Sequence, residues 1–508
     1  MVSDFWLDAA WSSALIVLGV TALSLLLAVP AAWLIERTDL LGAALLDRVL
    51  TLTYALPSYL LAIAWVVLAN PAVGWINRFA GVLGAERAVS VYNLGGVVLV
   101  EASALFTILF FGVGAGLRQM DPALEEAARL AGASPIRVFF TITAPLLKGH
   151  LGAGLVAVAL ASLASFGVPA ILGAPARRYV LTTAIYAKIQ EGGAEAFREA
   201  LLVSLGLAAV TLGLIVVTSR WSKRRIALVG GKASRPARIE LGRWRRPLAA
   251  LLFAVWGGLV LLPLAALVTS SFLAEPGVLS WSNLTLRSWR HVLFSLDAFR
   301  AALANSLAVA ALAAVAVIAV SGLTAVAAWH GRYQDRRGLG RFGATTENGA
   351  LFFYSLPGTV LALCLLIVAT RLGRLGLVDT LAILVIAYVV KYATLGLQTV
   401  RPAALLIDPS LIESAQLAGA GWAQRTGRIW LPLLRPALFA AGFLVFLPCL
   451  SELTMSVLLC GPDTETLGVV LFNLQEYADR ASAAVVGTLL LALVVVLRLA
   501  ARRLEHGA

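Results

Sequence analysis

Three ionisable residues fall within or at the edge of long apolar segments: Glu101, Lys391 and Glu452. A charged side chain is costly in hydrocarbon, so residues of this kind usually face the interior of a helical bundle or a water-filled cavity. Glu452 is therefore a candidate to line a polar path for a cation. The alternative for each of the three is a structural pairing or an interfacial position, and Lys391 is also compatible with a role in helix packing.

Residues that could support catalysis or bind a metal are few and scattered. The three cysteines lie in or beside apolar segments without the paired spacing of a disulfide framework, and the four histidines form no cluster. The phosphate-binding pattern Gly-x-x-x-x-Gly-Lys-Ser/Thr does not occur, because Gly231-Lys232 is followed by Ala233 and lacks the upstream glycine. We therefore expect no catalytic residue, no metal site, no cofactor and no ATP hydrolysis by this chain itself.

The composition is that of a membrane protein. Hydrophobic residues make up 60% of the 508 residues and charged residues only 13%, and the mean hydropathy is +0.90. A soluble domain has roughly a quarter charged residues, so this chain is not expected to be soluble. Its long unbroken apolar runs indicate helices rather than a barrel, because a helix satisfies its own backbone hydrogen bonds in lipid. The net charge of +13 is better explained by membrane orientation than by nucleic-acid binding.

Apolar segments long enough to cross a hydrocarbon core of about 30 Å recur along the whole chain. We predict an all-α, polytopic helical membrane protein with about eleven transmembrane helices. The predicted spans are 12–35, 49–69, 96–117, 151–173, 200–219, 248–272, 303–329, 349–369, 379–398, 436–459 and 482–500.

The basic residues predict how these spans are oriented. One side of the membrane receives 27 of the 40 Lys and Arg residues and is therefore expected to be cytoplasmic, with the N-terminus outside. Ten of the 27 lie between Arg220 and Arg246, where Gly and Pro also occur. We interpret residues 221–247 as a basic cytoplasmic linker next to anionic lipid. It separates a first half, residues 1–220, from a second half, residues 248–508.

An internal repeat relates the two halves. Residues 121–151 match residues 408–438 at 14 of 31 positions, at a constant offset of 287 and without gaps. A shorter pair, Tyr54-Ala-Leu-Pro57 and Tyr354-Ser-Leu-Pro357, agrees in order. Six predicted spans separate the two long copies. Because six is an even number, both copies are expected on the cytoplasmic side.

Each long copy is predicted to form a helix, a turn and a second helix. Asp121 is placed to cap the first helix, with Pro122 at the first helical position, and Gly132 to end it. Ser134-Pro135 starts the second helix, and Pro145 is expected to close it before the next span. The second copy repeats this plan from Asp408 to Pro432. A compact hairpin with small residues on one face suits docking into a groove of another protein, whereas the alternative is an amphipathic loop on the membrane surface.

These segments resemble the EAA loop of importer permeases of the ATP-binding cassette family. That pattern is Glu-Ala-Ala, a Gly six residues after the Glu, and then Ile-x-Leu-Pro. The first loop, residues 121–147, has Ala144 where Leu is usual, and the second, residues 408–434, has Ser414 in place of the first Ala. The matching positions, which the resemblance implies contact an ATPase, are Glu126, Ala127, Ala128, Gly132, Ile142 and Pro145, and Glu413, Ala415, Gly419, Ile429, Leu431 and Pro432.

The resemblance implies the fold, the partners and the location. Two tandem type I importer permease bundles would form a multi-pass protein of the bacterial inner membrane. Each loop would dock one copy of an ATP-binding subunit, and a periplasmic or lipid-anchored solute-binding protein would deliver substrate from outside. Membrane lipid is the other expected partner. Transport would proceed by alternating access. A secondary transporter driven by an ion gradient would explain the spans and the duplication but not the paired loops.

Among permeases with two fused copies, this chain resembles the ferric-iron importers most, and the alternative is an importer of thiamine or of another small solute in the same family. Two segments carry this resemblance, one from Ser165 through Pro169 to Gly173, and one from Glu452 to Leu459. The second half has a leading span, 248–272, that has no counterpart before residue 12. Permeases of this type usually have a matching first span in both halves, so either eleven spans follow an outside N-terminus or the start is assigned too far downstream.

Overall fold

The computed structural model describes residues 2–84, 89–223, 238–334, 337–373, 376–477 and 479–507. Regular secondary structure in these ranges is helical, with two isolated β-bridges at Thr38–Ile239 and Leu273–Leu284. Most of the predicted basic linker lies outside the described residues. The fold class expected from hydropathy is confirmed.

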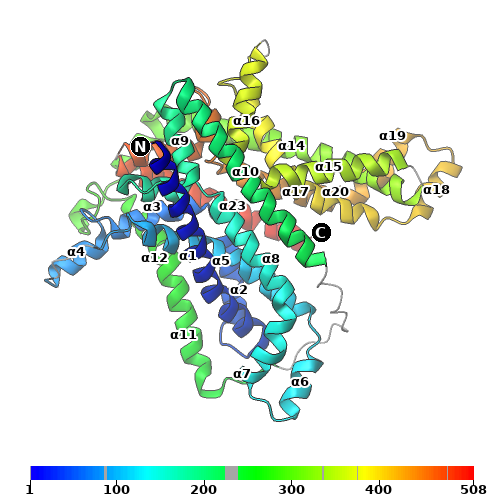
Figure 1. The fold of residues 1–508 in the computed structure, drawn as a ribbon, viewed down its shortest axis with the longest axis horizontal. Coiled ribbons are helices and arrows are strands. Elements are labelled where there is room, and N and C mark those ends of the chain that lie inside the picture. Colours follow the sequence, from blue (N-terminus) through cyan, green and yellow to red (C-terminus); the bar gives the residue numbers. More distant parts are fainter. Residues whose placement is uncertain are drawn as a thin grey trace. The chain divides into compact units, whose positions relative to one another are not determined.

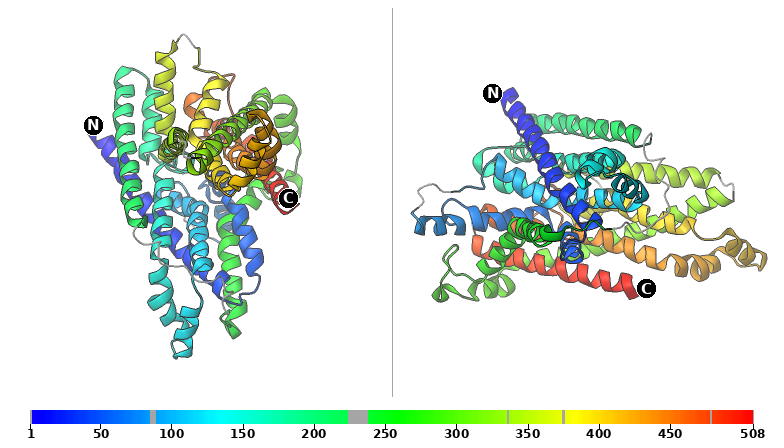
Figure 2. Two further views of the ribbon diagram at one scale, coloured as in Figure 1. Left: turned by 90° about the vertical axis from the view of Figure 1, so that its right-hand side faces the viewer. Right: turned by 90° about the horizontal axis from the view of Figure 1, so that it is seen from below.

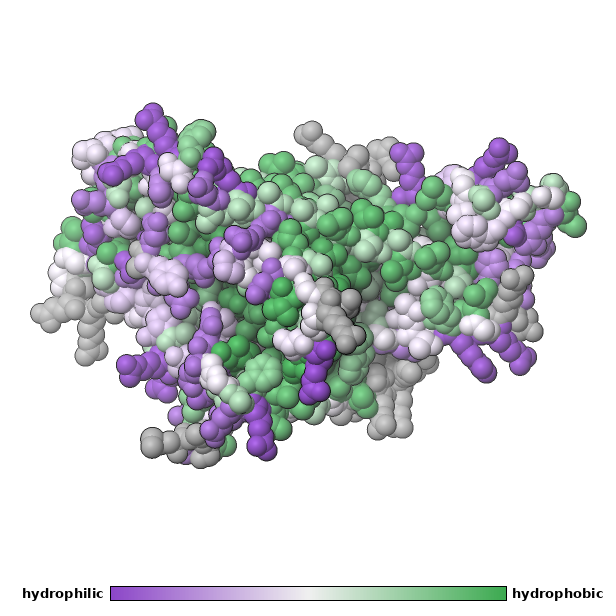
Figure 3. Space-filling model, turned by 90° about the horizontal axis from the view of Figure 1, so that it is seen from above, coloured by the Kyte–Doolittle hydropathy of each residue, from purple (hydrophilic) through white to green (hydrophobic). Residues whose placement is uncertain are grey.

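Among the described residues, nine helices are long and apolar enough to cross a membrane, and two further pairs of helices pass the same test together. The total of up to eleven among the described residues agrees with the predicted number of spans. On the face drawn in Figure 3, apolar side chains form broad patches and hydrophilic side chains gather toward the edges. The long helices therefore carry the surface that lipid requires.

The described residues form two compact units, residues Met1–Arg290 with Gln475–Leu491 and residues His291–Leu474 with Ala492–Ala508. In the first unit α1 packs along α5, and α5 packs along α8 (Figure 1). Its helices are α1 (Val2–Arg37), α2 (Ala43–Tyr54), α3 (Ser58–Ala69), α4 (Trp75–Val82), α5 (Leu94–Gln119), α6 (Ala123–Leu130), α7 (Pro135–Val138), α8 (Ala144–Leu163), α9 (Leu181–Glu191), α10 (Ala194–Lys223), α11 (Arg245–Trp256), α12 (Leu262–Ser270) and α13 (Arg287–Arg290), with short turns η1 (Phe139–Thr143), η2 (Pro169–Gly173), η3 (Ala174–Ala176), η5 (Gly242–Trp244), η6 (Gly257–Leu261) and η7 (Trp281–Asn283).

The second unit repeats this plan, with α14 packed along both α17 and α20. Its core includes the fully buried side chains of Val317, Leu384 and Tyr388. Its elements are η8 (His291–Ser295), α14 (Asp297–Tyr333), α15 (Arg337–Ser355), α16 (Gly358–Arg371), α17 (Leu381–Leu405), α18 (Pro409–Leu417), α19 (Trp422–Arg425), η10 (Thr426–Trp430), α20 (Leu431–Leu450), α21 (Ser456–Leu459) and α22 (Leu467–Glu476), and α23 (Arg480–Gly507) contributes to both units.

The predicted leading span of the second half packs within the first unit. The indole Nε1 of Trp65 on α3 donates to the carbonyl of Leu259 at 3.2 Å, and Nε1 of Trp256 on α11 donates to Thr53 Oγ1 at 3.1 Å. Helix α12 also packs on α3. The halves defined by the sequence repeat and the units defined by contact therefore do not share one boundary.

Two predicted spans are sharply bent rather than straight. Helices α2 and α3 meet at 102°, and α15 and α16 meet at 112°. Each bend falls at a Leu-Pro pair, Leu56-Pro57 and Leu356-Pro357. Proline disfavours the helical conformation at the residue before it and lacks the N–H that would continue the helix. Hydropathy counts apolar residues on both sides of such a break and cannot detect it.

The predicted spans 151–173 and 436–459 also extend too far as single helices. Helix α8 ends at Leu163 and α20 ends at Leu450, and each is followed by non-helical residues before the short elements η2 and α21. Non-helical backbone at membrane depth is tolerated where it is buried in protein. Pro169, Ala170, Ile171 and Leu172 of η2 are buried in this way.

Candidate subunit-docking site

Both predicted loops form short helical hairpins at one end of their own helix bundle, α6–α7 in the first unit and α18–α19 in the second (Figures 1 and 2). Oδ1 of Asp121 accepts the N–H of Ala123 at 2.9 Å, and Oδ1 of Asp408 accepts the N–H of Ser410 at 2.9 Å. The hydrogen bonds from Ser410 hold the pKa of the Asp408 carboxyl below its usual value. The carboxylate cap is therefore intact at neutral pH and is lost only as the pH falls through that lowered pKa.

The same backbone turn ends both first helices. Gly132 and Gly419 have φ angles of +86° and +80°, a left-handed conformation that glycine adopts without strain. The N–H of Ala133 donates to the carbonyl of Ala128 at 3.0 Å, and the N–H of Ala420 donates to that of Ala415 at 2.9 Å. These bonds satisfy helix-terminal carbonyls, as predicted for a glycine just past a helix end.

The second helix of each hairpin continues into the following span. Pro135–Leu163 and Trp422–Leu450 each form one long helical segment. The expectation that Pro145 closes a separate helix is therefore wrong. Pro145 and its counterpart Pro432 lie at the starts of α8 and α20, each directly after a π-helical turn, η1 or η10. The wider turn places a proline, which lacks an N–H, within a continuous helix.

Most of the predicted contact residues lie on the hairpin surfaces. Glu413 and Ala127 are exposed, whereas Glu126, Ala128 and Ala415 are partly buried. Farther along the chain, Ile142 and Ile429 are partly buried, and Pro145, Leu431 and Pro432 are exposed. A partner that covers the hairpins would therefore reach these side chains, and their contact with it stays a prediction.

Sequence reasoning missed the leucines of the hairpins. Leu130 and Leu417, which are equivalent in the repeat, are each 90% exposed, and the equivalent pair Leu124 and Leu411 is 50% and 49% exposed. Apolar side chains exposed together at a polar end of a bundle are typical of a protein interaction site. Their identity in both copies was the signal in the sequence. The prediction from sequence used only the small residues of the hairpins, which permit a close approach of two backbones, and did not include these leucines.

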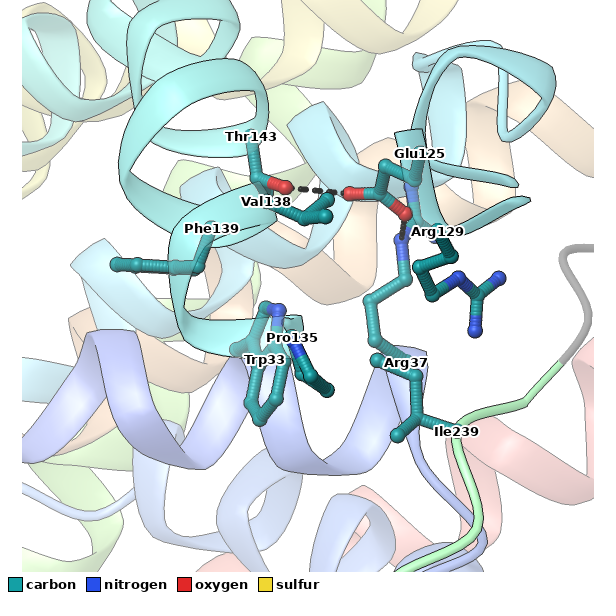
Figure 4. Close-up of a pocket in the computed structure, with 9 residues that line it drawn as sticks. All are labelled: Trp33, Arg37, Glu125, Arg129, Pro135, Val138, Phe139, Thr143 and Ile239. Atoms are coloured by element: carbon teal, nitrogen blue, oxygen red, sulfur yellow. Dashed lines mark hydrogen bonds and ion pairs between the residues drawn. The ribbon is translucent and has the colours of Figure 1, made fainter. Parts of the chain in front are cut away.

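A buried ion pair attaches the first hairpin to its bundle (Figure 4). Nε of Arg37, at the end of α1, lies 2.8 Å from Oε2 of Glu125 on α6. The hydroxyl of Thr143 donates to Oε1 of the same carboxylate at 2.6 Å. Nη2 of Arg37 donates to the carbonyl of Leu117 on α5 at 2.8 Å. Both carboxylate oxygens of Glu125 are therefore hydrogen-bonded away from water.

An aromatic cluster attaches the second hairpin. Trp329 on α14 is fully buried, and its ring lies edge-on to that of Trp430, with centroids 5.1 Å apart. Its Nε1 donates to the carbonyl of Ile407 at 3.0 Å, directly before α18. Ile412, a buried residue of α18, belongs to the same cluster. The two hairpins thus have similar backbones but unlike attachments.

The three ionisable residues of the apolar segments have internal partners. The carboxylate of Glu452 accepts the N–H groups of Met455 and Ser456, at 2.9 and 3.0 Å, and the hydroxyl of Ser456 at 2.7 Å. Nζ of Lys391 donates to the carbonyls of Tyr354, at 2.9 Å, and Leu356 at the bend before α16. Glu452 thus caps α21, and its role in a transport path stays a prediction.

Glu101 is fully buried on α5 and accepts a hydrogen bond from Ser162 on α8 at 2.9 Å. The repeat offset relates Ser165, which follows α8, to Glu452 in the second half. The buried carboxylates Glu101 and Glu452 therefore do not occupy equivalent positions in the repeat. No group of three or more His, Cys, Asp and Glu residues suited to a metal ion occurs among the described residues.

Residues 24–224 and 336–507 match the family model described as "Binding-protein-dependent transport system inner membrane component". The chain is similar to a probable ABC transporter permease protein of Sinorhizobium fredii, with 26% identity over 84% of this chain and 79% of that protein. It is similar to a Fe(3+)-transport system permease protein of Haemophilus influenzae, with 23% identity over 89% of this chain and 81% of that protein. A molybdenum transport system permease protein of Escherichia coli is 32% identical over 43% of this chain and 97% of its own length.

Proposed function

The chain belongs to the family of inner membrane components of binding-protein-dependent transport systems, and on this premise we propose that it is the permease subunit of an ATP-binding cassette importer for ferric iron. The observation that carries the proposal is the pair of matching hairpins. Each ends its first helix at a left-handed glycine and presents a leucine that is 90% exposed at the same repeat position. Two equal sites on one chain suit two copies of one partner.

In this function the chain spans the inner membrane and does not hydrolyse ATP. Each hairpin faces the cytoplasm and docks one ATP-binding subunit, whose closure on ATP displaces the hairpin. Because α7 continues into α8 and α19 into α20, a displacement of either hairpin passes directly to a membrane-spanning helix. A solute-binding protein outside delivers the substrate, and the two bundles open alternately to the two sides of the membrane.

Ferric iron is supported by how much of the chain each kind of relative covers. Relatives named as ferric transport permeases align with 89%, 77% and 83% of this chain, and so with both halves. The molybdenum permeases align with 43% and 40%, about one half. The solute-binding protein selects the ion in this proposal, and the permease supplies a weakly binding path. Tight ligation of a hard cation would need a cluster of oxygen ligands and would trap the ion.

Deleting the gene is expected to impair growth when iron is scarce, because uptake of ferric iron through the importer is lost. Added ferric iron should restore growth, and added thiamine should not. A plasmid copy of the gene serves as the control and should restore growth without supplements. Restoration by thiamine alone would assign the chain to thiamine uptake, and normal growth of the deletion strain in low iron would refute the iron proposal.

Glu126→Lys and Gly419→Asp are each expected to weaken binding of the ATP-binding subunit at least tenfold while membrane insertion stays normal. The first reverses a charge on the α6 surface. The second adds a side chain at a left-handed position with no other atom within 4 Å, so its cost within the permease is confined to backbone strain of about 1–2 kcal/mol. Co-purification of the subunit from solubilised membranes measures both effects.

Gly84→Asp is the matched control for Gly419→Asp. Gly84 has a φ angle of +80° and nothing within 4 Å, but it lies in a segment predicted to be outside. The same strain and charge are thus introduced away from the hairpins, and binding should stay at the parent level. Normal yields of the ATP-binding subunit with both Glu126→Lys and Gly419→Asp would contradict the docking role.

A further inference from the structure

The buried ion pair of the first unit joins four elements at one point. Arg37 and Glu125 are only 2% and 5% exposed, and Thr143 is 1% exposed. Through the contacts described above, Arg37 connects the end of α1 to the end of α5 and to α6, and Thr143 adds η1 (Figure 4). The hairpin that is proposed to receive an ATP-binding subunit is thus linked by hydrogen bonds to two membrane-spanning helices at once.

Helix α6 is attached to its bundle through one buried side chain. Glu125 is the single buried residue among its eight. An isolated helix of this length is not stable in water, so the position of α6 depends on its tertiary contacts. Both carboxylate oxygens of Glu125 accept hydrogen bonds, one from Arg37 and one from Thr143. Arg37 belongs to a different helix, α1. Any displacement of α6 must therefore either carry Arg37 with it or break the pair.

A buried ion pair is poor evidence for stabilisation alone. Removing two charges from water offsets much of their attraction, and replacing such a pair with apolar residues of similar size is often neutral or stabilising. Removing one partner is different, because it leaves an unpaired buried charge and is strongly destabilising. The pair is thus a link that is costly to open but adds little to folding, a property that suits transmission of movement.

The second unit has a link at the same repeat position with different chemistry. Ile412, equivalent to Glu125, is the single buried residue of α18. Trp430 is equivalent to Thr143, and Trp329 reaches the cluster from α14, as Arg37 reaches the pair from α1. An apolar contact permits small sliding movements because it has no required direction, whereas the bonds of Arg37 to Glu125 and Leu117 are directional.

We propose that Arg37 and Glu125 are a positioning pair, which transmits movement of α6 to α1 and α5 when an ATP-binding subunit on the first hairpin closes. The proposal rests on the proposed function. It goes further in assigning the two docking sites unlike connections to the membrane, a directional ionic link in the first unit and an apolar cluster in the second. This role requires no contact of either residue with nucleotide or substrate. Both act through the orientation of α6.

The test uses the permease in lipid nanodiscs with its ATP-binding subunit. For Glu125→Gln we expect the rate of ATP hydrolysis at saturating subunit to fall at least tenfold. The dissociation constant of the subunit should change less than threefold, because the exposed leucines are unaltered. A variant that only loosened the loop would instead raise the dissociation constant and leave the saturated rate unchanged, and that result would overturn the proposal.

Glu36→Gln is the matched control. Glu36 pairs with Arg118, so it links α1 to α5 with the same chemistry one residue away, but its partner lies on α5 rather than α6 and is largely exposed. We expect its saturated rate to stay within twofold of the parent rate. Equal losses for Glu36→Gln and Glu125→Gln would overturn the proposal, because the effect would then not depend on the link to α6.

A double-mutant cycle shows whether the two residues act as one unit. Arg37→Met and Glu125→Met should each impair hydrolysis, whereas the double variant, which leaves no unpaired charge, should be no worse than the poorer single variant. Losses that multiply would overturn the pairing. If a single variant does not fold, the rate of hydrolysis by the double variant can still be compared with that of the parent protein.

Hydrogen exchange of residues 123–130 in the permease alone tests the link without any partner. Exchange should be at least tenfold faster in Glu125→Gln than in Glu36→Gln, and equal protection in the two variants would overturn the proposal. A parent permease that binds no ATP-binding subunit would refute the proposed function instead, and this exchange measurement would still decide the link.

Discussion

Leu130→Asp combined with Leu417→Asp is expected to abolish binding of the ATP-binding subunit at both hairpins. Each leucine is 90% exposed, and burying such a side chain contributes about 1.5–3 kcal/mol. Its loss alone corresponds to roughly a tenfold to hundredfold weaker site. A carboxylate in its place must also lose its hydration on docking, which adds to the cost. The measurement is the amount of ATP-binding subunit that co-purifies with each single variant and with the double variant.

Leu279→Asp provides the control for these substitutions. Leu279 is 60% exposed in a segment predicted to lie outside, so the same change there should leave subunit binding at the parent level. Each single hairpin variant should retain one working site and therefore about half the bound subunit. Parent levels of bound subunit in the double variant would show that the exposed leucines do not form the docking surface.

Trp329→Ala is expected to lower stability by about 3–5 kcal/mol, as found when large aromatic core residues are truncated. The side chain of Trp329 is fully buried and reaches neither lipid nor water. Its removal leaves a cavity against Trp430 and an unpaired carbonyl at Ile407. The free energy of unfolding in detergent measures the loss, and hydrogen exchange in α18 shows whether the hairpin is released first.

Two further substitutions separate packing from hydrogen bonding. Trp329→Phe keeps most of the ring volume and loses the bond to Ile407, so a cost of about 1 kcal/mol is expected. Trp422→Ala removes a tryptophan that is 64% exposed on the same hairpin and should change stability by less than about 0.5 kcal/mol. If Trp329→Ala unfolded like the parent protein, the aromatic cluster would not be the attachment of the second hairpin.

The two units show why the common backbone of the hairpins could be predicted from the sequence and the difference in their attachments could not. The residues that define the hairpins act locally, since Asp408 bonds to Ser410 and Gly419 ends its own helix. Interactions of this kind, between residues close together in the chain, can be predicted directly from the sequence. Glu125 and Ile412 occupy one repeat position and look like an ordinary helix-surface residue and an ordinary apolar one. Their common role as the buried residue of a short helix depends on which distant residues reach them.

The sequence by itself determined the helical membrane class, the number of spans, the duplication and the paired hairpins. These follow from the free energy of transfer into lipid and from hydrogen bonds between near neighbours, both of which are properties of short segments. The packing of α12 on α3 and the exposure of Leu130 were decided only by the tertiary structure. So was the pairing of Arg37 with Glu125 across 88 residues, because hydropathy specifies that a helix enters the membrane but not which helices it meets there.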